Sequence, residues 1–572
     1  MMIRTFVLLI IISPGLFAAP VESDFPWQSW GKEAFEQARK EDKFVLLSLQ
    51  AWWCHPCHQM NTITYDDPAV RELIAKKFIP VFVDQDGRPD ISQRFERWGW
   101  PATIIFAADG TEIVKLKGFY SPKFFMPILQ ATIDDPSPVN YGRMQGPERA
   151  VSQTIQLNDE QRRVIVDFMN KMYDDTHGGW GRNSKFVHGP TFDYALEQTA
   201  INSFDEKRAR QTIDGLIAMV DKDSGGVSQI SLAMDWNKGL EEYPMFAQLA
   251  GLQAFSLAYS LWQEPRYLHA AQRVSDFLRN TMSAEDGGFY TSTGAHNFNP
   301  GVDRRRYARE NGQAILALTH LYNVTGDSAL LEFIERQAQW VLDNRSLDSG
   351  GFRHDRVDQG GPYLVDSLSM GRAMLALYQS GAKRDWLVRA RNTADFIADN
   401  FIDADTGGFI AAVRPAGDFM TKAVKNKDDN VAATRFFNRL YYYTGDKRYT
   451  EIARNAMGYL TSDHVLDAYW FLPGVLQAEY ELSNQPVHIT VVGHKDDPQA
   501  ARLHTAALAY PTNYKRAEWW DKREGPLPND DVSYPQLTRA AAFACTDSVC
   551  SSPVYNREDL AAAVLRLMPQ SR

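Results

Sequence analysis

The sequence predicts a multidomain protein with an N-terminal α/β domain, a large helical domain and a small C-terminal α/β segment. Three observations predict this order. An apolar strand pattern at 44–49 leads directly into a Cys-x-x-Cys motif that opens a helix. Between 151 and 482, long helical patterns are separated by recurring Gly-Gly-aromatic turns. After 486, strand and helix patterns alternate again.

Length and composition narrow the possible partners. The 572 residues, 44% of them hydrophobic, are enough for several domains with large cores. The formal net charge is -10 and the chain has no long basic run, so we expect no nucleic-acid partner. Aromatic residues make up 12% of the chain, which suits a helical core as well as a sugar-stacking groove, so composition does not choose between them.

The N-terminus has the pattern of a secretory signal peptide. Arg4 precedes an apolar run from Phe6 to Phe17, and two small residues, Ala18 and Ala19, follow. We expect cleavage after Ala18, which removes residues 1–18 and yields an exported protein, periplasmic if the source is a Gram-negative bacterium. An uncleaved anchor is the alternative. Beyond the signal, no run reaches the about 18 uninterrupted apolar residues of a membrane span, so we expect none.

Residues 25–133 carry the alternating patterns of one α/β domain. Asp109-Gly110 predicts a hairpin turn between its last two strands. Residues 134–150, which contain Asp-Asp-Pro-Ser-Pro, are predicted to be a linker. The predicted helices cover 30–40, 67–78 and 91–98, and the predicted strands cover 44–49, 79–84, 103–107 and 113–118.

The Cys-x-x-Cys motif consists of Cys54 and Cys57 at the start of the helix that follows the strand at 44–49. A thiolate on the first turn of a helix lies against the positive end of the helix dipole, which lowers its pKa and makes it nucleophilic. We therefore predict that Cys54 is the attacking thiolate and that Cys57, one turn further on, resolves the mixed disulfide. Positive charge on His55 and His58 would stabilise the thiolate.

The chain has only 4 cysteines, too few for a disulfide scaffold in an exported protein of this size. For the second pair, Cys545 and Cys550, a structural disulfide is favoured over an internal relay to Cys54. For the Cys-x-x-Cys motif itself, the alternative is a structural zinc site. Its other two ligands would be Cys545 and Cys550, or His55 and His58. Because a strand precedes the motif and a helix follows it, we favour a redox-active disulfide and expect neither metal nor another cofactor.

The residues around the dithiol resemble those of thioredoxins. Trp53 precedes the first cysteine, Pro56 precedes the second, and Trp100-Pro101 later opens a β-branched apolar run. In thioredoxins this proline is cis and packs against the dithiol, so the resemblance implies a cis bond before Pro101 and places this residue in the site. Ser48 stands where thioredoxins have a buried Asp, so the usual proton acceptor for the resolving cysteine is missing.

Further stretches match one family over nearly the whole mature chain. They are Cys54-His55-Pro56-Cys57-His58-Gln59-Met60, Asp67-Pro68-Ala69-Val70, 83–91, 99–103, the Gly-Gly-Trp-Gly motif at 178–181 with Lys185-Phe186, and the tail cysteines followed by Pro553. The chain thus resembles the thioredoxin-domain family typified by the spermatogenesis-associated thioredoxin-like proteins. The resemblance implies a thioredoxin-like fold followed by a six-hairpin-glycosidase-like helical domain. Pro56 stands where this family usually has Trp.

The helical domain, 151–482, repeats one kind of turn, and the later turns lie roughly sixty residues apart, about the length of a helical hairpin. Repeated hairpins must bury their apolar faces against neighbours. The spacing resembles the (α/α)6 barrel, a closed double ring of helices found in many sugar-processing enzymes and epimerases. An open solenoid is the alternative. The turns are Gly178-Gly179-Trp180, Gly225-Gly226-Val227, Gly287-Gly288-Phe289, Gly350-Gly351-Phe352 and Gly407-Gly408-Phe409.

A sugar-cleaving barrel needs an acid and a carboxylate that face each other across the sugar. None of the acidic residues stands in a diagnostic motif, and acids at helix starts are usually caps. Trp180, Trp236 and Tyr363 would stack on sugar rings or lie in the core. The candidate acids are Asp193, Glu241, Glu242, Glu310, Asp366 and Asp428, with His354 as an alternative base.

The tail, 486–572, predicts strands at 488–493 and 514–519 and helices at 498–509 and 558–568. Together, the patterns predict an exported thiol–disulfide oxidoreductase with a Cys-His-Pro-Cys dithiol. Its partners would be a protein client and an electron donor or acceptor, with the helical domain binding the client or a saccharide. One alternative is a saccharide-processing or saccharide-binding protein with an accessory thioredoxin-like domain. The other is a non-catalytic metal-binding or protein-docking module.

Overall fold

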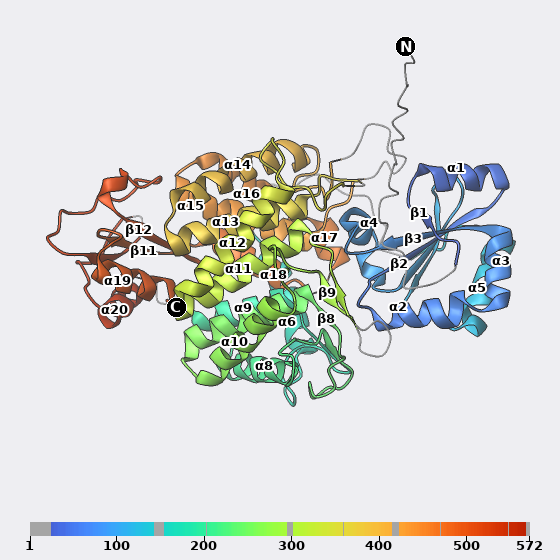
Figure 1. Cartoon of the computed structure of the whole chain (residues 1–572), viewed down its shortest axis with the longest axis horizontal. Helices are drawn as coiled ribbons and strands as arrows, with labels where there is room; N and C mark the ends of the chain where they lie inside the picture. Colours follow the sequence, from blue (N-terminus) through green and yellow to red (C-terminus); the bar gives the residue numbers. More distant parts are fainter. Residues whose placement is uncertain are drawn as a thin grey trace, which may run out of the picture.

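The computed structural model describes residues 25–141, 154–201, 203–294, 301–358, 360–413, 423–469, 471–546 and 548–567. The predicted signal peptide and the second half of the predicted linker lie outside these residues. Three parts follow one another along the long axis of the molecule, with the helical domain in the middle (Figure 1). No described helix is long and apolar enough to cross a membrane.

The N-terminal domain is built on a five-stranded sheet of order β1-β3-β2-β4-β5. The first three strands in this order run parallel, and β4 and β5 are added antiparallel. The sheet was predicted apart from its short first strand. The strands are β1 (Gln28–Ser29), β2 (Phe44–Gln50), β3 (Phe78–Asp84), β4 (Ala102–Phe106) and β5 (Glu112–Lys117).

Helices cover both faces of this sheet. Because side chains alternate along a strand, Val45, Leu47 and Leu49 of β2 join the core under α1 and α4, whereas Leu46 joins the core under α3 and α5. The predicted helix at 91–98 is instead α4 followed by a 3-10 turn, and α5 was not predicted. The helices are α1 (Lys32–Glu41), α2 (His55–Gln59), α3 (Pro68–Lys77), α4 (Pro89–Arg94) and α5 (Pro122–Asp134).

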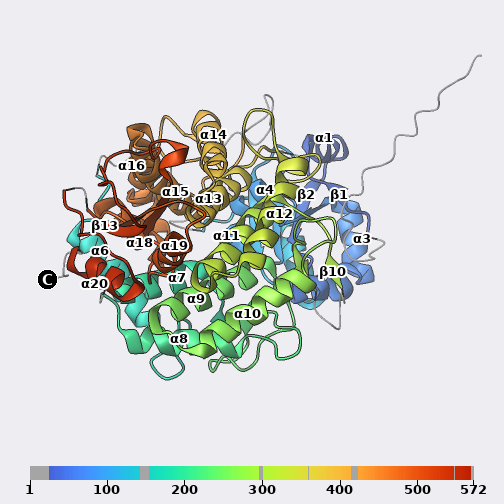
Figure 2. The ribbon, with the colours of Figure 1, turned by 60° about the vertical axis from the view of Figure 1, so that its left-hand side comes forward.

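The helical domain is a closed double ring, and Figure 2 shows the inner helices surrounded by the outer ones. Each inner helix contacts the next, α7 with α9, α11, α13, α15 and α18 in turn, and α18 contacts α7. The contact between α18 and α7 closes the ring, so the predicted (α/α)6 barrel is confirmed and the open solenoid is excluded. The inner helices are α7 (Gly189–Ala200), α9 (Met245–Trp262), α11 (Ala308–Thr325), α13 (Leu364–Gly381), α15 (Lys427–Thr444) and α18 (Pro473–Ser483).

Sequence composition decides which helices lie inside. The inner helix α13 is buried along almost its whole length, whereas the outer helix α10 buries one apolar face and exposes its charges. A short helix, α17 (Asp463–Ala468), precedes α18. The outer helices are α6 (Asp159–Met172), α8 (Glu206–Ala218), α10 (Pro265–Asn280), α12 (Ser328–Arg345), α14 (Arg384–Phe401) and α16 (Lys447–Leu460).

The Gly-Gly-aromatic turns have a structural explanation. Each one follows an outer helix and returns the chain toward the next inner helix. At Gly287 and Gly288 the φ angles are 103° and 80°, and a Cβ on Gly288 would lie 2.6 Å from the ring of Trp340. Glycine permits both this conformation and this close approach. The repeat is therefore explained by the geometry of the hairpin turns.

The C-terminal segment covers the end of the barrel at which the inner helices finish, since α19 contacts α11, and β12 contacts α13 and α15. Its sheet has the order β12-β11-β13, of which β13 was not predicted. The elements are β11 (Val487–Val492), α19 (Pro498–Leu508), β12 (Lys515–Trp520), β13 (Ala541–Cys545) and α20 (Arg557–Leu567). The fold class expected from the sequence, α/β plus α, is confirmed.

Candidate functional site

The predicted cysteine pair is joined in a disulfide at the end of β2. Cys54 caps the N-terminus of α2, and its Sγ accepts a hydrogen bond from the backbone N–H of Cys57 at 3.2 Å. Pro56 fits in the first turn of α2. Backbone N–H groups in a first turn have no partner within the helix, so a proline there costs no helical hydrogen bond. This local geometry is what a nucleophilic cysteine at a helix N-terminus requires.

Pro101 reaches the same end of the sheet from β4. The Trp100–Pro101 bond is cis, as the resemblance implied, and Ala102 pairs with Leu49 near the end of β2. Trp100 packs on the small cluster that contains both cysteines. Cys54 and Cys57 are only 2% and 1% exposed. The disulfide is therefore enclosed, and another molecule can reach its sulfur atoms only after part of the surrounding side chains moves.

Aromatic side chains from both domains, Trp53, Trp100 and Phe246, form the cover of the disulfide. The indole of Trp53 packs edge-on against Trp100, with ring centroids 5.7 Å apart, and against Phe246 of the first turn of α9 at 5.8 Å. The Trp53 Nε1–H donates to Asp86 at 3.0 Å, so the ring is held in place. Phe246 is 42% exposed and is the part of the cover nearest to solvent.

The two histidines of the motif play different parts. His58 is buried, and its Nε2–H donates to the carbonyl oxygen of Trp52 at 2.9 Å. Burial lowers the pKa of His58, so this side chain is neutral near pH 7 and does not supply the positive charge that we expected. The backbone N–H of His55 donates to the carboxylate of Glu242, on the helical domain, at 2.7 Å.

Neutral polar groups surround Ser48 on β2, the strand that leads to the dithiol. Ser48 accepts hydrogen bonds from Gln50 at 2.8 Å and from the hydroxyl of Tyr65 at 3.2 Å. The amides of Gln50 and Asn61 bond each other in both directions. The position at which thioredoxins have an Asp thus carries no carboxylate here.

The end of the barrel at which the inner helices begin is docked on the thioredoxin-like domain. Asp84 and Asp86, at the carboxyl end of β3, pair with Arg305 and Arg309. The ring of His354 bonds the backbone oxygen of Asp86 at 2.7 Å. Burial and the charge of Asp84 raise the pKa of Asp86 to about 7, although Arg309 opposes this shift.

Most of the predicted acids are engaged in protein contacts. Asp366 accepts from the backbone of Arg309 and lies 2.9 Å from the ring of His354, while Glu310 pairs with Arg309. Glu242 bonds His55 across the domain boundary. The remaining acids are Asp193, which pairs with Arg435 at 2.6 Å, Asp428, which pairs with Lys427 at 2.7 Å, and Glu241, which is exposed.

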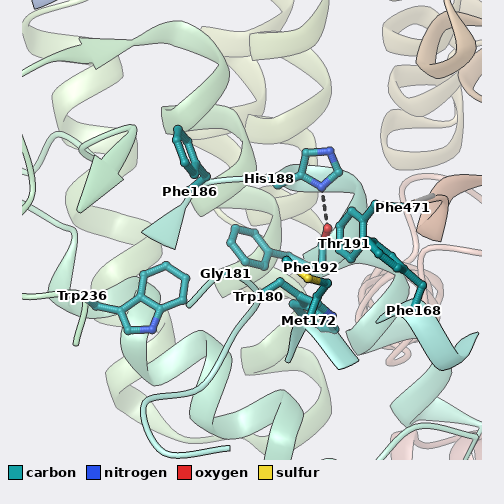
Figure 3. A pocket seen from close by; sticks show the side chains of 10 residues that line it. All are labelled: Phe168, Met172, Trp180, Gly181, Phe186, His188, Thr191, Phe192, Trp236 and Phe471. Atoms are coloured by element: carbon teal, nitrogen blue, oxygen red, sulfur yellow. Dashed lines mark hydrogen bonds between the residues drawn. The ribbon is translucent and has the colours of Figure 1, made fainter. Parts of the chain in front are cut away.

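A cavity of about 250 Å³ lies beside α7 (Figure 3). The indole N–H groups of Trp180 and Trp236 donate to backbone oxygens, and His188 bonds Thr191. Burial lowers the pKa of His188 to about 4, so its ring is neutral. Tyr363 lies in the core, 1% exposed. The lining is Phe168, Met172, Trp180, Gly181, Phe186, His188, Thr191, Phe192, Trp236 and Phe471.

This cavity is connected to the dithiol by a short chain of hydrogen bonds. The residue after Phe186, Val187, donates its N–H to the backbone oxygen of Gln229 at 2.9 Å. The side-chain amide of Gln229 donates to Glu242 at 2.6 Å, and Glu242 bonds the backbone of His55. Phe186 is 58% exposed, so it forms a solvent-facing part of the cavity lining.

The second cysteine pair lies in another part of the molecule. Cys545 and Cys550 form a disulfide after β13, beyond the far end of the barrel (Figures 1 and 2). A zinc site or a relay that joins the two pairs is therefore excluded in this arrangement. Among the described residues, no three His, Cys, Asp or Glu side chains are arranged to hold a metal ion.

Sequence reasoning missed the contributions of Asp86, Phe246 and Gln229. Asp86 lies in a stretch that carried the family resemblance, at the edge of the sheet where the dithiol also lies. That shared edge was the one available signal. Phe246 and Gln229 belong to a different domain from the cysteines, and their proximity follows from domain docking alone.

The comparisons with known proteins agree with this description. A family model, Thioredox_DsbH, described as "Protein of unknown function, DUF255", matches residues 13–128. That range contains the dithiol, the cis proline and all five strands of the sheet. The N-terminal domain belongs to this thioredoxin-like family. The resemblance that the sequence motifs indicated is confirmed for this domain.

Two kinds of curated relative match the chain. Human spermatogenesis-associated protein 20 is 24% identical over 307 residues, 47% of this chain and 38% of the relative. The chain thus spans less than half of that relative's length. Thiol:disulfide interchange protein DsbD of Ralstonia nicotianae is 32% identical over 105 residues, 18% of this chain and 17% of the relative. Thioredoxin H7 of Arabidopsis thaliana is 30% identical over 104 residues, 18% of this chain and 72% of the relative.

Among solved structures, similar chains include a D-mannose isomerase, with a TM-score of 0.47 and 14% identity, over 57% of this chain and 96% of that one. Another is a sugar epimerase from a ruminal bacterium, with a TM-score of 0.45 and 16% identity, over 53% of this chain and 86% of that one. The (α/α)6 architecture rests on the closed ring of helix contacts and not on these likenesses.

Proposed function

We propose that the chain is an exported thiol–disulfide oxidoreductase whose Cys54–Cys57 couple exchanges disulfides with a protein client. The observation that carries the proposal is a disulfide at the N-terminus of α2, directly after the central strand β2 and beside the cis Pro101. The likeness to a thiol:disulfide interchange protein and to a thioredoxin supports it. The export step rests on the N-terminal sequence pattern.

The exchange has two displacements. In the reducing direction, the Cys54 thiolate attacks one sulfur of a client disulfide, forms a mixed disulfide and releases a client thiolate. Cys57 then loses its proton and attacks Cys54, which restores the Cys54–Cys57 disulfide and releases the second client thiolate. The client gains two electrons, and a separate dithiol donor must reduce the pair again. In the oxidising direction the same steps run backwards.

We propose that the helical domain contributes to client binding. The cavity beside α7 is lined by aromatic side chains whose N–H groups are already bonded, so it favours an apolar side chain over a hydroxyl-rich sugar. Hydrogen bonds through Val187, Gln229 and Glu242 link its lining segment to the dithiol helix. An apolar side chain of an extended client seated there would hold the client near the cysteines once the cover opens.

The test is a redox titration of the full chain in a series of glutathione buffers, with the thiols trapped in acid, alkylated after denaturation and counted by mass spectrometry. We expect a reversible Cys54–Cys57 couple with a reduction potential between about -120 and -270 mV, the range of known oxidoreductases. The same spectra report Cys545 and Cys550 separately. A pair that never re-forms, or that stays masked until a metal is chelated, would refute the proposal.

A saccharide function is the second candidate, favoured only by the (α/α)6 architecture of the domain. Most of its predicted acids are paired in protein contacts, and the docked thioredoxin-like domain covers the barrel end at which they lie. Calorimetric titration with mono- and oligosaccharides, compared between the full chain and a Trp180→Ala variant, tests it. Binding that Trp180→Ala abolishes would support this function.

A further inference from the structure

Glu242 is a buried carboxylate of the helical domain that touches the dithiol helix. It is 1% exposed, and its two oxygens accept hydrogen bonds from the backbone N–H of His55 at 2.7 Å and from the side-chain amide of Gln229 at 2.6 Å. Both donors are uncharged. Among the ion pairs of the described residues, none includes Glu242. A buried charge with only neutral partners is costly, so its location against the redox site calls for a chemical explanation.

Glu242 and Cys54 use the same helix terminus. The first turn of α2 has two N–H donors, since Pro56 has none: the N–H of His55 donates to Glu242, and that of Cys57 is shared between the backbone oxygen of Cys54 at 3.0 Å and its Sγ at 3.2 Å. The free N–H groups of a first turn carry the positive end of the helix dipole. If both groups are ionised, two negative charges share this terminus in a region of low dielectric constant.

We infer that Glu242 is a positioning residue of the redox site: its carboxylate opposes ionisation of the Cys54 thiol and thereby lowers the reduction potential of the Cys54–Cys57 couple. The inference rests on the proposed thiol–disulfide exchange and deepens it. A negative charge destabilises the reduced form, which carries the thiolate, and leaves the neutral disulfide unaffected. Glu242 thus makes the pair a stronger reductant.

The proton balance follows from this arrangement. Reduction of the disulfide consumes two electrons from the donor dithiol and two protons, one for each cysteine if both end as thiols. If Cys54 ends as a thiolate, its proton can reside on Glu242 instead, which removes the repulsion. Burial raises the pKa of Glu242, while its bonds with Gln229 and His55 act in the opposite direction. The pair therefore titrates as a coupled unit.

The test compares Glu242→Gln with Glu241→Gln in the full chain. The first variant removes the charge and keeps an amide oxygen for the His55 N–H, and the second removes a charge from the adjacent exposed residue. We expect Glu242→Gln to lower the pKa of the Cys54 thiol by about one unit, read from thiolate ultraviolet absorbance. The reduced form gains up to about tenfold in population, which raises the reduction potential by up to about 30 mV. Glu241→Gln should leave both unchanged.

The pH dependence of the reduction potential distinguishes an electrostatic role of Glu242 from a merely structural one. Below the raised pKa of Glu242 the wild-type carboxyl is neutral, so wild type and Glu242→Gln should converge, and above it they should diverge. The titratable side chains on the segments that contact Glu242 are Cys54, His55, Cys57 and His58, while Gln229 adds an uncharged amide. Glu241 and Tyr243 flank it in the chain. All of these side chains are present in both proteins, so the difference between the two pH profiles reports the Glu242 charge and its coupling to the Cys54 thiol.

The outcomes separate the two proposals. If the couple is reversible but wild type, Glu242→Gln and Glu241→Gln share one potential and one thiolate titration, Glu242 is only structural and this inference is overturned. If wild type has no reversible couple, the proposed function fails and the inference fails with it. If Glu242→Gln does not fold, the wild-type thiolate titration decides: two coupled steps support the inference, and a single step overturns it.

Discussion

The two disulfides of this chain have similar short loops but very different surroundings. Cys54 and Cys57 lie at a helix N-terminus, are almost fully buried, and are covered by side chains from two domains. Cys545 and Cys550 lie at the end of a strand, where they form an antiparallel bridge, and Cys550 is exposed. The helix terminus offers N–H donors to a thiolate, whereas the strand end offers none of this electrostatic support. We therefore propose that Cys54–Cys57 is the reactive pair and Cys545–Cys550 the structural pair.

The largest expected effect is on insulin-disulfide reduction, which should depend on Cys54 and Cys57 but not on Cys545 and Cys550. Cys54→Ser should reduce insulin-disulfide reduction to the uncatalysed rate, because the attacking thiolate is lost. Cys57→Ser should accumulate a mixed disulfide with insulin, detected by mass spectrometry. The double variant Cys545→Ser/Cys550→Ser is the matched control and should keep the wild-type rate within about twofold. Activity retained in Cys54→Ser would contradict the roles assigned here.

The second prediction concerns the docked domain that encloses the reactive pair. Arg309→Ala leaves the buried Asp86 and Glu310 without their cation and should cost about 3–5 kcal/mol of unfolding free energy in urea. Reduction of Cys54–Cys57 by dithiothreitol should become faster. The control is Arg448→Ala, which breaks an exposed pair with Asp446 and should cost at most about 1 kcal/mol. Equal effects of the two variants would show that docking does not enclose the dithiol.

The third prediction concerns the structural pair. Removal of the Cys545–Cys550 disulfide, with a sequence separation of 5, should destabilise the C-terminal segment by about 2 kcal/mol according to the loop-entropy model. Hydrogen exchange of β13 and α20 should accelerate accordingly, while exchange in β2 and β4 stays unchanged. Faster exchange in the thioredoxin-like domain would argue that the two ends of the molecule are coupled.

The smallest expected effect concerns the aromatic part of the cover. Phe246→Ala removes a ring contact with Trp53, and aromatic pairs are worth about 0.5–1.5 kcal/mol. Reduction of Cys54–Cys57 should therefore accelerate by about two- to tenfold, with no change at Cys545–Cys550. Phe124→Ala, which truncates a 63% exposed phenylalanine on α5, is the control. A rate unchanged in Phe246→Ala would mean that the cover opens elsewhere.

Much of the fold could be predicted because its determinants are local. The apolar strand at 44–49, the Cys-x-x-Cys that caps the next helix and the Gly-Gly-aromatic turns each act over a few residues, and each lies in the structure where its pattern placed it. The turn spacing also predicted repeated helical hairpins, and its resemblance to the (α/α)6 barrel implied a closed ring. Two errors were local as well: the helix predicted at 91–98 breaks after Arg94, and α5 was overlooked.

The candidate site was only half predictable. Glu241 and Glu242 are neighbours with the same chemistry, and their sequence gave no reason to separate them. In the structure one is exposed and the other bonds His55, 187 residues away in the chain. Likewise, the acids proposed for sugar chemistry are mostly paired with arginine, lysine and histidine side chains.

The sequence by itself determined the dithiol, its helix and the repeated hairpins, because hydrogen-bonding patterns and side-chain periodicity act between near neighbours, whereas the cis proline was implied by the resemblance to thioredoxins. Tertiary structure alone decided that the ring closes between α7 and α18, that the barrel docks on the thioredoxin-like domain, and that Glu242 lies against the dithiol. Those contacts join residues that are far apart in the chain. Their geometry depends on how whole domains pack, which no local pattern encodes.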